Sequence, residues 1–364
     1  MERRILEMKT LVRQLIGSSG IPKYILGTSD FARTAFRYLE SACGGDGRIK
    51  GFINEISDIR TFEGLPVIHR LEDLEMDAIV LNTLVGIAPV TMKRRLGRAG
   101  IRNVDFFSFI RESGFPIEIP FWSGFRESYA SRREEYDLLA DRLSDEESRQ
   151  VYADLMDFRL NYNLEAMERY SVRPTEQYFE PFLHLGEKEV FCDIGGYVGD
   201  TTEEFIRRCP GFRKIWFFEP EPSLMSQAKK RLQAFGDIVY APFAASDRSG
   251  RAFFDSSDSS SRLSESGDFQ VNIVRIDDVV DSQITYLKMD IEGSESKALS
   301  GARETILRYH PRLAVCVYHN GADYIDIPKQ VLSIRDDYDL YLRHYTEGVT
   351  ETVMYFIPHK ETDE

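Results

Sequence analysis

The chain has 364 residues, 42% of them hydrophobic, and a formal net charge of −14 at pH 7. This length predicts more than one domain, and the acidic balance argues against a protein that binds a nucleic-acid backbone, because such proteins carry clustered Lys and Arg. No apolar run approaches the roughly 18 residues of a membrane span, and the charged start is unlike a signal peptide. We therefore expect a cytoplasmic protein without a membrane span, for which a homo-oligomer is an open possibility.

The first 110 residues alternate between short apolar runs and amphipathic segments. The runs KYILG, IKGFI, DAIVLN and NVDFF have the length and composition of strands, whereas SDFARTAFRYLESA and APVTMKRRLGRAG have helical spacing. Strands and helices in alternation predict a small parallel α/β domain over residues 1–110.

Residues 111–188 are charged and rich in helix-favouring residues, and they predict a helical connector. Two segments, SRRE from Ser131 and SDEE from Ser144, have the spacing of a capping box, in which a serine side chain begins a helix. An aromatic run with Tyr178 and Phe182 ends this stretch. It is interpreted either as core packing or as a wall of a substrate site.

A larger α/β domain is predicted for residues 189–364. Strand-like runs such as KIWFFEPE, ITYLKMD and RLAVCVYH alternate with helical patterns, and YDLYLRHY and TVMYFIP flank turn residues. The last two runs predict an antiparallel strand pair that completes the sheet. The serine-rich residues 255–268 predict a flexible loop.

The segment EVFCDIGGYVGDTTEEF, residues 189–205, joins a buried-looking strand to a helix through a glycine turn. Glycines before a helix let a ligand approach the backbone amides. An aspartate just before the turn would repel a phosphate but attract a cationic amino acid group, which favours S-adenosylmethionine, a cofactor without phosphate. The expected contacts of that cofactor are Asp193, Gly195, Gly196, Tyr197, Gly199 and Thr201.

Glu219 ends the next predicted strand, in WFFEPEP, and is followed by Pro220. A carboxylate at this position can accept hydrogen bonds from both ribose hydroxyls of an adenosine ligand. The end of the third strand, with Ala245, Ser246 and Asp247, is placed to hold the adenine ring.

The order DIGGYVGD, FEPEP, AASDRSG, RIDDVV and YLKMDIEGSESKALSGA resembles the FkbM family of S-adenosylmethionine-dependent methyltransferases over roughly residues 189–358. KMDIEGSE is the most characteristic of these motifs. The resemblance implies the class I methyltransferase fold, a Rossmann-like sheet of seven strands, and methylation of hydroxyl oxygens of sugars, glycolipids or polyketides. The usual family turn has Ala-Asn where Gly196 and Tyr197 stand, so the edge of the cofactor site is expected to differ here.

The N-terminal segments YILGTSDFARTAFRYL, IKGFIN and FEGLPVIHRLEDL resemble the Rossmann-like N-terminal domain of sugar acetyltransferases. The motif keeps Gly27 but has Ser29 and Ala32 at the later glycine positions. The resemblance implies either a docking site for a carbohydrate or nucleotide sugar, or a scaffold without a ligand.

The catalytic candidates are polar residues at the ends of strands four and five, because ligands of open α/β sheets lie at the carboxyl ends of the strands. Asp290 could contact the cofactor, orient the acceptor, act as a base or bind Mg²⁺, or it could cap a helix or brace the glycine turn. Glu292 follows it closely and has the same alternatives. His319 could titrate near neutrality and act as a general base, or it could be a structural histidine.

Together these features favour an S-adenosylmethionine-dependent O-methyltransferase of carbohydrate biosynthesis, acting on a small-molecule or glycan acceptor. The alternative is a non-catalytic binding or scaffold protein of glycan biosynthesis with a degenerate methyltransferase domain. An NAD-dependent oxidoreductase is disfavoured because the turn at Gly27 lacks the later glycines that pyrophosphate binding requires.

Overall fold

The computed structural model describes residues 2–17, 20–42, 48–257, 260–264 and 269–359. Contacts within the chain divide it into two compact units. Unit 1 comprises residues 1–119, 153–172 and 346–350, and unit 2 comprises residues 120–152, 173–345 and 351–364. Residues 111–188, predicted as a connector, thus contribute to both units.

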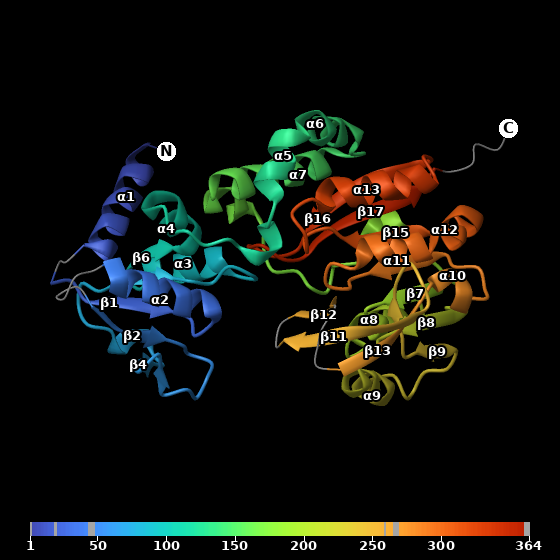
Figure 1. The fold of residues 1–364 in the computed structure, drawn as a ribbon, viewed down its shortest axis with the longest axis horizontal. Helices are drawn as coiled ribbons and strands as arrows, with labels where there is room; N and C mark the ends of the chain where they lie inside the picture. The colour runs from blue at the N-terminus through green and yellow to red at the C-terminus, as the bar shows by residue number, and fades with distance from the viewer. Residues whose placement is uncertain (1, 18–19, 43–47, 258–259, 265–268, 360–364) are drawn as a thin grey trace. The chain divides into compact units, whose positions relative to one another are not determined.

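Unit 1 contains a six-stranded sheet in the order β3-β4-β2-β1-β5-β6, parallel except for the β3-β4 pair (Figure 1). Its strands are β1 (Lys23–Leu26), β2 (Ile49–Ile53), β3 (Thr61–Phe62), β4 (Leu65–Ile68), β5 (Ile79–Asn82) and β6 (Arg102–Asp105). Its helices include α1 (Glu2–Ile16), α2 (Asp30–Ala42), α3 (Pro89–Arg98), α4 (Phe106–Ser113) and the short η1 (Leu71–Asp73) and η3 (Leu164–Arg169). The central strands β1 and β5 are buried at every position, which explains the apolar residues 24–26 and 79–81; each strand also buries one polar end residue, Lys23 and Asn82.

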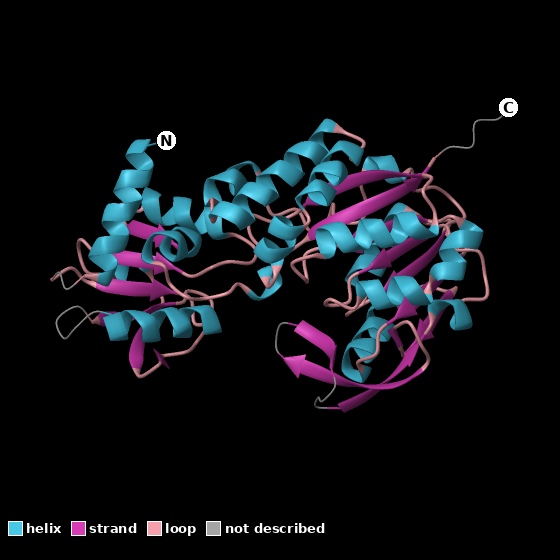
Figure 2. Cartoon of the chain, turned by 45° about the horizontal axis from the view of Figure 1, so that its top comes forward, coloured by secondary structure: helices cyan, strands magenta, loops and turns pink. Residues whose placement is uncertain are grey.

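Unit 2 is built on a seven-stranded sheet in the order β16-β17-β15-β14-β7-β8-β9. Figure 2 draws the strands of the chain in magenta and its helices in cyan. The strands are β7 (Val190–Ile194), β8 (Lys214–Phe218), β9 (Ile238–Ala241), β14 (Tyr286–Met289), β15 (Arg312–Cys316), β16 (Tyr338–His344) and β17 (Thr352–Pro358). Only β17 runs antiparallel to its neighbours β15 and β16, and the other pairs are parallel. The predicted fold class, a seven-stranded sheet with an antiparallel C-terminal pair preceded by a smaller α/β domain, is confirmed.

The helices of unit 2 that follow the sheet strands are α8 (Asp200–Arg208), α9 (Pro222–Arg231), α10 (Ile276–Val279), α11 (Glu295–Gly301), α12 (Arg303–Tyr309) and α13 (Asp323–Ile334). The chain order reverses between β7 and β14: β8 and β9 extend the sheet on one side, β14 and β15 on the other. Such a switch point opens a crevice at the carboxyl ends of the strands, and it positions the candidate site.

The serine-rich segment corrects one prediction. Strands β11 (Gly250–Ser257) and β12 (Ser260–Ser264) pair in antiparallel fashion and join β13 (Phe269–Val274) and β10 (Ala244–Ala245) in a second sheet. The flexible loop predicted for residues 255–268 is therefore wrong for 255–257 and 260–264, and 258–259 and 265–268 lie outside the described residues. Strand pairing is made by hydrogen bonds between backbone N–H and C=O groups, so a serine-rich sequence does not prevent it.

Along the chain, α5 (Phe125–Ser131), α6 (Arg133–Arg142) and α7 (Glu146–Asn161) come between β6 and β7, as do the short η2 (Pro120–Trp122) and η4 (Pro181–Leu183). Neither predicted capping box forms. The Ser131 hydroxyl donates to the Glu127 carbonyl, and Ser144 accepts from the Leu340 N–H. Asp145 caps α7 instead, because its carboxylate accepts from the Ser148 N–H at 2.8 Å.

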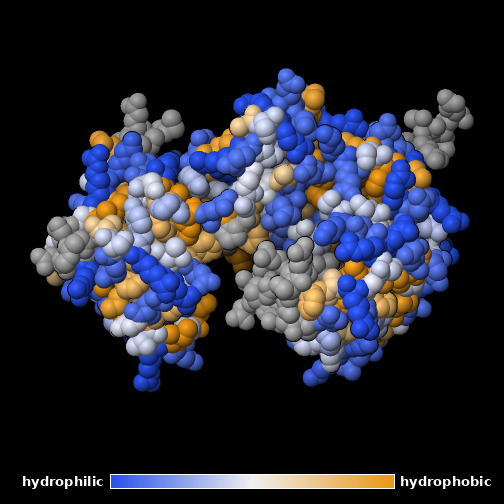
Figure 3. Space-filling model, viewed as in Figure 1, coloured by the Kyte–Doolittle hydropathy of each residue, from blue (hydrophilic) through white to orange (hydrophobic). Residues whose placement is uncertain are grey.

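The outer surface mixes hydrophilic residues with scattered apolar ones (Figure 3), as is usual for a protein in water. Among the described residues, no helix combines the length and the apolar character needed to cross a membrane.

Candidate active site

The glycine turn after β7 is shaped by close packing. Gly195 has φ +81°, and a Cβ there would lie 1.9 Å from the Asp290 carbonyl oxygen. A Cβ on Gly196 would lie 2.3 Å from the Phe217 ring, and the N–H groups of both glycines donate to the Phe218 carbonyl. A residue with a Cβ cannot occupy either position unless its neighbours move, so the two glycines allow the turn to pack closely against Phe217 of β8 and Asp290 after β14.

Asp193, at the end of β7, is fully buried and braces this turn. Its carboxylate accepts a hydrogen bond from the Thr202 hydroxyl at 2.6 Å and lies 3.1 Å from the Lys288 ammonium of β14. Lys288 also donates to the Gly195 carbonyl at 2.7 Å. Burial opposes the charge on Lys288, but attraction to Asp193 and Asp290 outweighs it and raises the pKa of Lys288 above its ordinary value. Asp193 is therefore paired within the protein, which gives it a supporting role in the site.

Glu219, just after β8, links two backbone segments. One carboxylate oxygen accepts from the Tyr197 N–H at 3.0 Å and the other from the Glu221 N–H at 2.8 Å. Each carboxylate oxygen has a second acceptor position, so Glu219 can still accept hydrogen bonds from a ligand. Burial raises the pKa of Glu219 to about 7. Tyr197 itself has φ +50° and a side chain that is 57% exposed, so it lies at the rim of the turn.

The remaining predicted cofactor residues have different surroundings. Gly199 adopts φ +81° directly before α8, and Thr201 is half-buried in the first turn of that helix. Pro220 is half-buried beside Glu219. Ala245 and Ser246 are buried, and Asp247 is exposed and accepts from the Ser246 hydroxyl at 3.1 Å. These last three lie where the seven-stranded sheet gives way to the second sheet, at β10.

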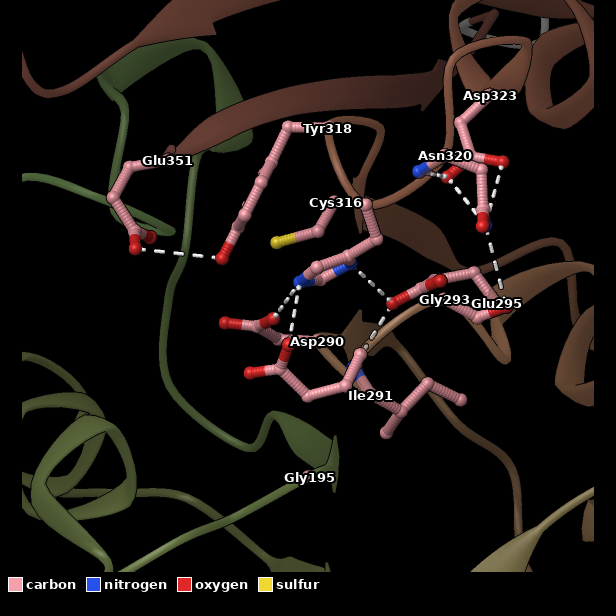
Figure 4. Close-up of polar contacts among 12 residues, drawn as sticks. Gly195, Asp290, Ile291, Gly293, Glu295, Cys316, Tyr318, Asn320, Asp323 and Glu351 are labelled. Carbon is pink, nitrogen blue, oxygen red and sulfur yellow. Dashed lines mark hydrogen bonds and ion pairs between the residues drawn. The ribbon is translucent and has the colours of Figure 1, made fainter. Parts of the chain in front are cut away.

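Three acidic residues lie within 4 Å of His319, so the structure brings the predicted catalytic residues together. Figure 4 shows two of these acids, Asp290 and Glu295. His319 Nε2 lies 3.6 Å from Asp290 Oδ1 and 3.4 Å from Glu292 Oε2, and Nδ1 lies 2.9 Å from Glu295 Oε1. Burial alone would lower the pKa of His319, but the carboxylates of Glu295, Asp290 and Glu292 raise it to about 10. While no other cation lies among them, these carboxylates favour the protonated form of His319, and this disfavours the predicted role as a general base.

Two residues outside the predicted site support this acidic cluster. Tyr178 is buried in the core of unit 2, and its hydroxyl donates to Asp290 Oδ2 at 2.8 Å. Glu295 accepts from the Ile291 N–H at 2.9 Å with the same oxygen that faces His319. The aromatic run before β7 is thus core packing, as one of the two interpretations proposed, and Tyr178 also reaches the site.

Sequence patterns carried weak signals for the residues that were missed. Lys288 is a lysine within an apolar strand run, and a lysine there needs a buried partner. Glu295 has the spacing of a first-turn charge, which is the ordinary interpretation of an acid at that position. Glu351, which accepts from the Gln177 amide at 2.6 Å and from the Tyr318 hydroxyl at 3.4 Å, follows a turn and has no distinctive local pattern.

Comparison with known families identifies the core of unit 2. Residues 193–345 match the family model described as the methyltransferase FkbM domain. This segment is similar to the methyltransferase FkbM domain. It contains the glycine turn, Glu219, Asp290 and His319, so the predicted family resemblance is confirmed for these residues. The predicted resemblance of the N-terminal residues to sugar acetyltransferases stays a prediction.

One solved structure supports the fold. A structure of the methyltransferase FkbM from Methylobacillus flagellatus KT is similar with a TM-score of 0.73 and 24% identity, covering 98% of each chain. A putative rRNA methylase from Clostridium thermocellum has 9% identity and a TM-score of 0.33, covering 48% of this chain and 88% of its own. A putative methyltransferase from Streptococcus mutans, in complex with SAH, has 12% identity and a TM-score of 0.31, with 47% and 90% covered. Comparison with curated proteins finds no match.

Proposed function

We propose that the FkbM methyltransferase domain transfers the methyl group of S-adenosylmethionine to a hydroxyl oxygen of a carbohydrate-like acceptor. The observation that carries this proposal is the placement of two acidic groups on one sheet edge. Glu219 follows β8, and Asp290 with its neighbours follows β14, on opposite sides of β7. One group suits the adenosine end of the cofactor and the other suits the acceptor.

The cofactor half of the proposal rests on Glu219. Its carboxylate keeps free acceptor positions after binding two backbone amides, as the two ribose hydroxyls require. The amides of Gly195 and Gly196 both bind the Phe218 carbonyl and the Tyr197 amide binds Glu219, so these three N–H groups are not available to a phosphate. An adenosine ligand without pyrophosphate fits this arrangement better than a dinucleotide does.

The acceptor half rests on the acidic cluster after β14 and β15. In the reaction, the acceptor oxygen attacks the methyl carbon in line with the departing sulfur, the carbon–sulfur bond breaks, and sulfur keeps the electron pair as S-adenosylhomocysteine forms. The hydroxyl proton must leave as the oxygen–carbon bond forms. The carboxylate of Glu292, whose pKa burial raises to about 7, takes up this proton, and the carboxylate of Asp290 holds the hydroxyl group in position.

Calorimetry with the full-length protein tests the proposal. We expect S-adenosylmethionine to bind and NAD not to bind. Glu219→Ala should weaken cofactor binding by about 10- to 150-fold, because a lost hydrogen bond to a charged group costs about 1.5–3 kcal/mol. Glu304→Ala, at an exposed acid in α12, is the matched control and should leave the affinity unchanged.

Two results would contradict the proposal. One is wild-type protein that binds NAD but ignores S-adenosylmethionine. The other is a folded Glu219→Ala variant with wild-type cofactor affinity. Cofactor binding without methylation of any polyhydroxylated acceptor in a panel would instead favour the non-catalytic scaffold.

A further inference from the structure

His319 is a buried polar side chain whose Nε2 atom faces the carboxylates of Asp290 and Glu292. Its side chain is 2% exposed. Among the residues that the structure describes, neither ring nitrogen has a hydrogen-bond partner of good geometry, although Nδ1 forms an ion pair with Glu295 Oε1 at 2.9 Å. The nearest oxygens are Asp290 Oδ1 at 3.6 Å and Glu292 Oε2 at 3.4 Å. A buried nitrogen that faces two carboxylates without a hydrogen bond needs an explanation.

The distances match a shared ion better than they match direct hydrogen bonds. An N–H···O hydrogen bond spans about 2.7–3.2 Å, and both contacts are longer. Two ligands that each lie about 2.1 Å from one metal ion are about 3.0–3.5 Å apart at octahedral or tetrahedral angles. Ligand atoms of Asp290, Glu295 and His319 all lie within 4.8 Å of one another, and Glu292 Oε2 lies 3.4 Å from the imidazole nitrogen that also faces Asp290.

The same residues are held in place as metal ligands usually are. A ligating histidine commonly pairs its other nitrogen with a carboxylate, and ligating carboxylates are themselves hydrogen-bonded. Here Nδ1 of His319 faces Glu295 at 2.9 Å, and Asp290 Oδ2 accepts from the Tyr178 hydroxyl at 2.8 Å. Asp290 Oδ1 and Glu292 Oε2 remain, and both lie within 3.6 Å of His319 Nε2.

We propose that Asp290, Glu292 and His319 bind one divalent transition-metal cation, with Glu295 and Tyr178 as positioning residues. A set of two carboxylates and one imidazole favours Mn²⁺ or Zn²⁺ over Mg²⁺, which prefers oxygen ligands alone and keeps its water. This proposal rests on the proposed function only for the role of the ion, which would hold the acceptor oxygens beside the methyl group. The binding of the ion can be measured without cofactor or acceptor.

The experiment is a titration of chelator-treated, full-length protein with Mn²⁺, followed by electron paramagnetic resonance of the free ion and by calorimetry. We expect one site with a Kd below about 100 µM, within the range of carboxylate-rich sites. Glu292→Gln and Asp290→Asn should each weaken binding at least tenfold. Glu295→Gln should weaken it by about 10- to 100-fold, as second-sphere changes do.

Controls separate binding from folding and from general charge. Glu304→Gln removes an exposed acid elsewhere in unit 2 and should leave the affinity unchanged. The half-buried Glu292 is the main test position, because its substitution should not unfold the protein, and melting of each variant without metal checks this. Mg²⁺ should compete with Mn²⁺ only at a concentration more than tenfold higher.

The proposal is overturned if no Mn²⁺ or Zn²⁺ site is tighter than about 1 mM, or if folded Glu292→Gln binds Mn²⁺ as tightly as wild type. Binding of Mg²⁺ as tight as that of Mn²⁺ would also overturn it, because it would indicate that His319 is not a ligand. Metal binding that fails while S-adenosylmethionine still binds refutes this inference alone. Metal binding that succeeds while S-adenosylmethionine does not bind refutes the proposed function alone.

Discussion

Removing the charge of Lys288 should strongly destabilise unit 2. Lys288 and Asp193 are 3% and 0% exposed, and their charged atoms lie 3.1 Å apart. In Lys288→Met the carboxylate of Asp193 stays buried with only the Thr202 hydroxyl as its hydrogen-bond donor. Breaking one side of a buried ion pair costs about 3–5 kcal/mol, because an uncompensated charge is left in a medium of low polarity.

A second substitution tests the cause of that loss. Asp193→Asn in the Lys288→Met background removes the remaining buried charge, and neutral replacement of a whole buried pair is often close to neutral in stability. We therefore expect the double variant to recover at least about 2 kcal/mol relative to Lys288→Met. Lys297→Met, at an exposed position of α11, is the control and should change stability by less than about 0.5 kcal/mol.

Urea unfolding followed by tryptophan fluorescence is a suitable assay. The chain has two tryptophans, Trp122 and Trp216, and both belong to unit 2, so the signal reports on the unit that contains the pair. A loss of less than about 1 kcal/mol in the free energy of unfolding of Lys288→Met would refute the proposed cost of the unpaired Asp193 charge. So would a double variant that is no more stable than Lys288→Met.

Two further predictions concern the cofactor site. Burial raises the pKa of Glu219 to about 7, and the ribose hydroxyls donate to its ionised form. The affinity for S-adenosylmethionine should therefore be constant above pH 8 and fall by up to about tenfold per pH unit below pH 7. Calorimetry from pH 5.5 to 8.5 should show this slope in wild type and a flat profile in Glu219→Gln, and equal slopes in the two proteins would contradict the prediction. Gly195→Ala places a Cβ 1.9 Å from the Asp290 carbonyl oxygen at φ +81°, so it should lower the free energy of unfolding by about 2–5 kcal/mol. Gly236→Ala is the control and should be close to neutral, because a Cβ there would have no atom within 4 Å. Similar unfolding midpoints for the two variants would argue against close packing at the turn.

Much of the site edge could be predicted from local sequence. A strand that ends in an acid before glycines, and a second strand that ends in Glu219, are short-range patterns, and parallel strands bring their carboxyl ends to one edge of the sheet. The same reasoning placed Asp290, Glu292 and His319 near one another. All three follow predicted strands that neighbour each other in the observed order.

The roles of individual residues depended on contacts that no local pattern contains. Asp193 was expected to face a cationic ligand, yet Lys288, almost a hundred positions later, pairs with it because β14 lies beside β7. His319 was expected to titrate near neutrality, but three carboxylates converge on it from outside β15 and raise its pKa to about 10. The charge state of a buried group is set by its neighbours in space, which sequence spacing does not reveal.

The sequence by itself determined the two α/β sheets, the FkbM motifs and the identity of the acids at the sheet edge, because these follow from hydrophobic periodicity and short-range spacing. Only the tertiary structure decided that Tyr178 reaches Asp290 from the segment before β7, that Glu295 faces His319, and that residues 346–350 of the β16–β17 turn belong to unit 1. Each of these contacts joins residues through the folded core, where packing and the pairing of buried polar groups, rather than local preference, select the partner.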